Sequence, residues 1–113
     1  MTADGLDDVI LTRRLDLADC PDGVVVEVGR PITSLDGREC RCFYRVRGFG
    51  KDRLSSGAGI DEVQALFLTL NKIGIELYAS EAYRTGKLYW LEAGNRDLGF
   101  PVPKGYGLGP EES

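Results

Sequence analysis

The sequence contains no histidine, and this absence removes the commonest general base and the usual catalytic triads. Cysteine is scarce as well. Cys20, Cys40 and Cys42 form no complete zinc site unless a carboxylate or a second chain adds a ligand. We therefore expect three free thiols, and we expect no catalytic residues, no metal, no cofactor and no enzymatic activity.

Long hydrophobic runs are also missing. No stretch approaches the ~18 apolar residues of a membrane span, and residues 1–8 are acidic and polar, unlike a secretory signal. We expect a cytoplasmic protein that does not bind membranes. With 113 residues, of which 42% are apolar and 28% charged, the composition is that of one globular domain.

A basic excess, which is typical of nucleic-acid-binding domains, is absent. The formal net charge is −4, and it resides in the tails, because residues 9–103 carry equal numbers of acids and bases. We therefore expect no nucleic-acid partner. Residues 38–53 are locally basic, which fits either a solvated strand and loop or a patch for an acidic partner.

Alternating apolar residues indicate a hairpin in the first 30 residues. The first strand runs from Val9 to Leu17 and the second from Val24 to Gly29, with Cys20-Pro21-Asp22-Gly23 as the turn between them. The core-facing residues of the two strands are predicted to be Val9, Leu11, Leu15, Leu17, Val24, Val26 and Val28.

A third strand, predicted over 39–49, has two contrasting faces. The core face holds Cys40, Cys42, Tyr44 and Val46. The other face is assigned to solvent, because its three arginines cannot all be buried unpaired; it holds Arg41, Phe43, Arg45 and Arg47. Residues 48–59 are rich in glycine and serine and predict a flexible loop, without the spacing of a phosphate-binding loop.

One long amphipathic helix is predicted to follow. Asp61 is the N-cap, Gln64 completes a capping box, and the helix frays near residues 79–80. Gly74 lies inside the apolar stripe and predicts a close approach of the helix to the sheet. The stripe itself is Val63, Leu66, Phe67, Leu70, Ile73 and Leu77.

A second, weaker stripe on the helix is formed by Gln64, Leu68, Asn71 and Ile75. Three covers are possible for it: the chain's own C-terminal segment, a second copy, or a different protein. The sequence leaves these alternatives open.

Beyond the helix, residues 87–91 predict a short fourth strand. Residues 97–103 predict an extended segment anchored by Phe100 and Val102, and its prolines exclude it from a central strand.

The domain organisation predicted is a flexible acidic N-terminus (1–8), a single domain (9–103) and a disordered tail (104–113). The fold predicted is α+β, a two-layer, mostly antiparallel sheet of about four strands (β-β-β-α-β) with one long helix packed on one face.

Three blocks of this sequence resemble a family of small bacterial proteins catalogued as a domain of unknown function. They are the arginine-rich stretch 42–48, the helix with its lead-in at 59–80, and the segment 97–103. The resemblance implies a bacterial, cytoplasmic setting and one compact domain, and it implies no catalytic motif.

These observations favour a protein-protein interaction module. Its predicted partner surface comprises Arg41, Phe43, Arg45, Arg47, Leu68 and Ile75, because arginine and aromatic residues are enriched at interfaces. The alternatives are a small ligand-binding domain or an enzyme without histidine, with Tyr44, Cys40 and Cys42 lining a pocket, and an immunity-type protein that neutralises a toxin. A homodimer formed through an exposed edge strand is a further possibility.

Overall fold

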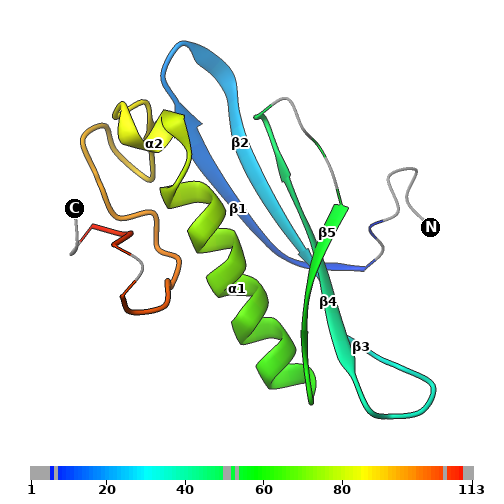
Figure 1. Ribbon diagram of the computed structural model, residues 1–113. Coiled ribbons are helices and arrows are strands. Elements are labelled where there is room, and N and C mark those ends of the chain that lie inside the picture. Colours follow the sequence, from blue (N-terminus) through cyan, green and yellow to red (C-terminus); the bar gives the residue numbers. More distant parts are fainter. Residues whose placement is uncertain (1–5, 7, 50–51, 53, 106, 111–113) are drawn as a thin grey trace.

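The computed structural model describes residues 6, 8–49, 52, 54–105 and 107–110. In chain order, the elements are β1 (Val9–Leu17), β2 (Cys20–Gly29), β3 (Ile32–Thr33), β4 (Cys40–Arg47), β5 (Leu54–Gly59), α1 (Glu62–Tyr78), α2 (Glu81–Arg84) and β6 (Leu88–Tyr89). The predicted α+β class, the antiparallel sheet and the single long helix on it are confirmed (Figure 1).

The sheet has six strands rather than about four. Its order is β3-β4-β2-β1-β6, with β5 on the opposite edge of β4, and the pairings are antiparallel. The strand after the helix, whose direction the sequence left open, is therefore antiparallel to β1. Strand β3 continues the line of β2 along β4 and was not predicted.

Strand β5 corrects the loop predicted for residues 48–59, of which 50, 51 and 53 lie outside the described residues. The glycines of β5 allow α1 to pack closely against the strand. A Cβ at Gly57 would collide with Thr69 of α1, and one at Gly59 would lie 2.6 Å from the backbone nitrogen of Ala65. The glycine-rich composition that predicted flexibility instead lets the helix lie directly on the strand.

The turn between β1 and β2 also lies earlier than predicted. It consists of Ala18 and Asp19, with Asp19 in the left-handed region at φ 69°, so Cys20 and Pro21 already belong to β2. Aspartate tolerates this conformation better than most residues.

The core lies between α1 and the inner face of the sheet, and the predicted inner residues of β2 and β4 are confirmed there. The most deeply buried members are Val24, Val26, Val28, Cys40, Cys42, Tyr44, Ile73 and Leu77. The first part of β1 is different: Val9 and Leu11, predicted to face the core, are 39% and 43% exposed. Helix α1 contacts β4 and β5, so it does not cover this end of β1.

Helix α1 begins as predicted, with Asp61 Oδ1 accepting a hydrogen bond from the Gln64 amide at 2.8 Å. Its rotation differs from the prediction. Val63 and Phe67, assigned to the core stripe, are 78% and 57% exposed, whereas Ala65 and Thr69 are fully buried. The helix presents its small residues to the glycines of β5, and this contact turns the first two turns of the apolar stripe away from the sheet.

The C-terminal segment 97–103, which we call the arm, lies along the second half of α1, on the side away from β5 (Figure 1). Gly74 contacts Pro101 of the arm, so its predicted close approach is to the arm and not to the sheet. Tyr78 fixes the other end, because its hydroxyl oxygen accepts a hydrogen bond from the Leu98 amide at 2.9 Å. The predicted anchors Phe100 and Val102 do pack against the core.

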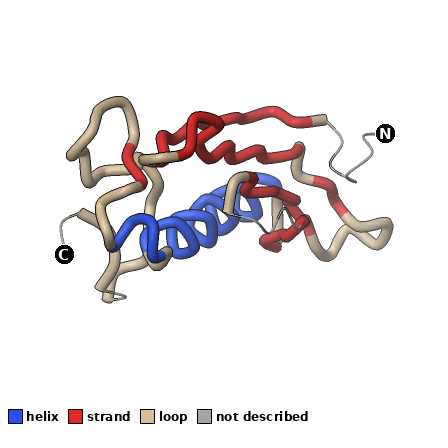
Figure 2. Tube along the Cα trace, turned by 90° about the horizontal axis from the view of Figure 1, so that it is seen from above, coloured by secondary structure: helices blue, strands red, loops and turns tan. Residues whose placement is uncertain are grey.

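Figure 2 shows β1 and β2 as a layer above α1, with the loops around α2 and the arm at one end.

The short helix α2 was not predicted. The last strand is also shorter than the predicted 87–91, because Leu91 adopts a φ of 75° and turns the chain away from β1. Leu108, from the stretch predicted as a tail, packs against the core, and residues 111–113 lie outside the described residues.

Neither helix in the described part of the chain combines the length and the apolar character that crossing a bilayer requires.

Candidate protein-binding site

The outer face of β4 brings together four residues of the predicted partner surface. Their neighbours across the strands are Val25 and Glu27 of β2 and small or apolar residues of β5. The assignment of Arg45 to solvent is wrong, because its side chain is only 4% exposed and is buried against a partner, with its guanidinium 2.7 Å from Glu27 Oε1. Arg47 lies 3.6 Å from the same oxygen. Two of the three arginines are thus held by a carboxylate of the protein itself, while Phe43 is half-buried.

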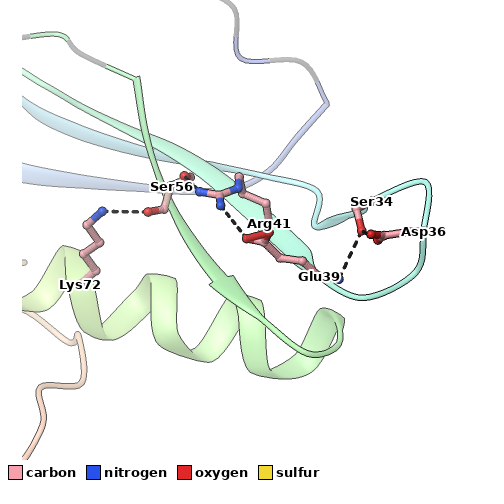
Figure 3. Close-up of polar contacts among 6 residues, drawn as sticks. All are labelled: Ser34, Asp36, Glu39, Arg41, Ser56 and Lys72. Atoms are coloured by element: carbon pink, nitrogen blue, oxygen red, sulfur yellow. Dashed lines mark hydrogen bonds and ion pairs between the residues drawn. The ribbon is translucent and has the colours of Figure 1, made fainter.

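Arg41, the third arginine, belongs to a set of contacts around the edge of β5. It donates hydrogen bonds to the Ser56 hydroxyl and to the Glu39 carboxylate, and Lys72 of α1 donates to the Ser56 carbonyl at 2.8 Å (Figure 3). The Lys72 ammonium therefore satisfies a backbone carbonyl at the edge of β5, which is then not available to an added strand. Lysine at a sheet edge is a common means of preventing another strand from pairing.

Leu68 and Ile75, the remaining residues of the predicted surface, lie on α1. Leu68 is 43% exposed and Ile75 half-buried, whereas Asn71 of the same stripe is buried and donates to the Phe67 carbonyl. The structure therefore does not join the helix residues to the arginine face of β4. The predicted surface consists of two separate parts, and its role in binding stays a prediction.

A different apolar surface lies on the first half of α1. Ile60, Val63 and Phe67 are 76%, 78% and 57% exposed. Ile60 precedes the helix, whereas Val63 and Phe67 lie at helical spacing on the face that, further along α1, carries Gly74 and Tyr78 and is covered by the arm. The arm covers one half of this face and leaves the other bare.

A cavity of about 200 Å³ adjoins this bare face, and we call it the β1 pocket. Leu70 of α1 forms one wall, and it is a surface neighbour of Phe67 and Val63 at i−3 and i−7. The other walls come from β1, β2 and the arm: Leu11, Arg13, Val26, Val28, Phe100 and Pro101. Val63 and Phe67 do not line the pocket, but their helical spacing from Leu70 places them next to it. We treat the pocket and these two exposed side chains as one candidate surface, which we call the α1–β1 groove.

The arm that closes one end of the groove is held by Arg13. Its guanidinium donates to the carbonyls of Leu98 and Gly99 at 3.2 and 3.0 Å. It also lies 3.9 Å from the ring centroid of Trp90 and 5.1 Å from that of Phe100. Hydrogen bonds and cation–π contacts of this kind fix the arm in place.

The outer edge of β1 borders the same groove. Among the described residues, β1 pairs with β2 along its length but with β6 only at Asp16 and Leu17. The segment Val9–Leu15, which we call the β1 edge, therefore presents backbone N–H and C=O groups without a strand partner there.

The titratable groups on the inner side of the sheet are used for packing. Burial raises the pKa of the Cys42 thiol, which therefore stays protonated and is a poor nucleophile. Burial also raises the pKa of Tyr44, whose hydroxyl donates to Glu76 at 2.9 Å. Both side chains belong to the core cluster, so the pocket predicted around Tyr44, Cys40 and Cys42 is occupied by core packing.

No group of three His, Cys, Asp or Glu side chains suited to a metal occurs in the part of the chain that the structure describes. Sequence reasoning missed the groove because it placed Val63 and Phe67 in the core. The signal available was the small pair Ala65 and Thr69, at i and i+4 on one face of the helix, opposite the glycines of β5.

Neither the curated proteins nor the solved structures contain a match to this chain. A family model covers residues 11–102, which include all of α1 and most of β1 and of the arm, so the chain belongs to the family described as a domain of unknown function, DUF6968.

Proposed function

We propose that this protein is a protein-binding module that receives a polypeptide partner in the α1–β1 groove. The observation that carries the proposal is the exposure of Val63 and Phe67 beside the β1 pocket. Contiguous apolar surface next to a cavity is typical of interaction sites. A large side chain seated in such a cavity is the usual hot spot of an interface.

The arm supports this proposal from within the molecule. An extended, proline-containing segment already binds the second half of the same helix face, with Pro101 against Gly74. The bare half continues that intramolecular interface, so a second extended segment finds the same kind of surface there. Toxin neutralisation, considered from the sequence, is one activity that such a module would perform through this groove.

The test compares three chains as baits for affinity capture, followed by direct titration of the purified partner. Replacing Val63 and Phe67 by glutamate should weaken partner binding at least tenfold and leave the melting temperature unchanged, because both side chains are largely exposed. The matched control is Arg47→Glu on the outer face of β4, which should bind like the wild type.

Two outcomes would contradict the proposal. Equal binding by the Val63→Glu/Phe67→Glu chain would exclude the groove. Loss of binding in Arg47→Glu alone would transfer the site to the arginine face predicted from the sequence.

A second candidate, small-ligand binding, is favoured by a cavity of about 470 Å³ between α1 and the C-terminal residues. Tyr78, Asp97 and Lys104 contribute polar groups to its wall and Phe100 and Leu108 contribute apolar ones. The volume falls in the range of small-molecule sites. A ligand screen by thermal shift, with Asp97→Asn as the comparison, tests this function, and hits that are equally strong in both chains would count against the cavity.

A further inference from the structure

The β1 edge gives the α1–β1 groove a backbone component. We propose that the partner presents an extended segment that pairs with the β1 edge as an additional strand, places one apolar side chain in the β1 pocket, and sets a carboxylate beside Arg14. This inference rests on the proposed function and specifies the form and chemistry of the partner segment.

Strand addition follows from the two unequal edges of the sheet. At β5, Lys72 holds the Ser56 carbonyl and protects the edge. At β1, the segment that could have protected the edge is β6, which ends at Tyr89 because Leu91 turns away. The β1 edge keeps its unpaired groups within the described structure, and an extended peptide satisfies such groups by forming ladder hydrogen bonds.

The β1 pocket defines the inward side of the added strand. Leu11 lies on the edge strand and also lines the pocket together with Phe100 and Leu70. A strand laid beside β1 directs alternate side chains to this face. The cavity of about 200 Å³ is smaller than a typical small-molecule site and suits a single aliphatic or aromatic side chain.

The charge on the outward side points to an acidic segment. Arg14 lies opposite Val25 on the outer face of the sheet and is exposed. Arg13 is committed to the arm, but Arg14 is the cation that a neighbouring strand would meet on this face. A carboxylate across from Arg14 is a favourable cross-strand pair. A second copy would instead bring its own Arg13 and Arg14 to an edge that already carries both.

The experiment uses defined peptide probes and the full chain. The first probe is a capped seven-residue peptide in which every second residue is glutamate. Valines and a central leucine occupy the positions between, so the apolar side chains share one face of the strand and the carboxylates the other. The second carries lysine in place of each glutamate. The third keeps the side chains of the first but is N-methylated at alternate amides, so it cannot form a ladder. Binding is measured by titration, and amide hydrogen exchange locates it on the chain.

The glutamate peptide should bind and slow amide exchange within residues 9–15. The lysine and N-methylated peptides should bind at least tenfold more weakly. In the Arg14→Glu chain, the preference between the glutamate and lysine peptides should reverse, with an unchanged melting temperature as the check on folding.

The proposal is overturned if the glutamate peptide fails to bind at about 1 mM, if N-methylation has no effect, or if protection appears on β5. Concentration-dependent protection of residues 9–15 without any peptide would assign the edge to a second copy and also overturn it. The proposed function fails separately, when the Val63→Glu/Phe67→Glu chain keeps its protein partner. If the partner binds in the groove but does not slow amide exchange in residues 9–15, only the strand-addition model is contradicted.

Discussion

At the scale of single residues, glycine sets the distances between the parts of this protein. Gly57 lets Thr69 of α1 meet β5, and Gly74 lets Pro101 of the arm meet α1. The two positions therefore control two different contacts, although the sequence alone predicts a loop glycine at position 57 and a contact between helix and sheet at position 74.

We predict that Gly74→Ala and Gly57→Ala produce different defects. Each should lower the free energy of unfolding by about 1–3 kcal/mol through overpacking, and at Gly74 this outweighs a gain of up to ~1 kcal/mol in helix propensity. Trp90, the only tryptophan, lies under Arg13 beside the arm. Its fluorescence should shift in Gly74→Ala and stay constant in Gly57→Ala. A shift in both chains would show that the arm and the sheet respond as one unit.

At the scale of elements, the pairing of β2 with β4 depends on the buried contact between Glu27 and Arg45. Replacing Arg45 by methionine leaves the Glu27 carboxylate, at a side-chain exposure of 19%, with the longer contact to Arg47 as its remaining ion pair among the described residues. We predict a loss of about 3 kcal/mol in the free energy of unfolding, because removing one partner of a buried ion pair leaves the other charge poorly compensated. The double variant Glu27→Leu/Arg45→Met should recover most of this loss.

The control for that pair lies at the start of the same strand, between Arg41 of β4 and Glu39 just before it. Arg41 and Glu39 are also in contact, but their side chains are 46% and 47% exposed. Arg41→Ala should cost less than about 1 kcal/mol, as exposed ion pairs contribute little. Chemical denaturation of the four chains measures both effects, and an equal loss at Arg41 and Arg45 would contradict the distinction between buried and exposed pairs.

The elements also show what a sequence can and cannot specify. The start of α1 was predictable because Asp61 and Gln64 have the chemistry of a cap. The rotation of α1 was not, since its periodicity identifies an apolar stripe without telling which neighbour covers it. Ala65 and Thr69 pack against the sheet because β5 has glycines at the contact. The sequence of β5, however, predicts a loop, so this contact could not be foreseen. The groove was hidden for the same reason, as its exposed residues are those assigned to the core.

At the scale of the whole molecule, buried tyrosines and a buried thiol link folding to alkaline pH. Burial raises the pKa of Tyr44, Tyr78 and Tyr83, and it does the same for Cys42. Unfolded tyrosine ionises near pH 10 and cysteine near pH 8.5. Above these values, the unfolded chain releases protons that the folded chain still holds, so stability falls as pH rises.

We predict that the stabilising effect of these groups is fully present below about pH 8 and is lost progressively through pH 9 to 11. Tyr44→Phe should flatten the decline above pH 10, because this variant removes one group whose ionisation favours the unfolded state, at the cost of the hydrogen bond to Glu76. Tyr89, which lies on the short strand β6 and outside the buried core cluster, is the matched control, and Tyr89→Phe should keep the wild-type slope. Denaturation midpoints recorded at half-unit steps from pH 7 to pH 11 give the slopes. A wild-type slope in Tyr44→Phe would show that Tyr44 ionises as readily in the folded chain as in the unfolded one.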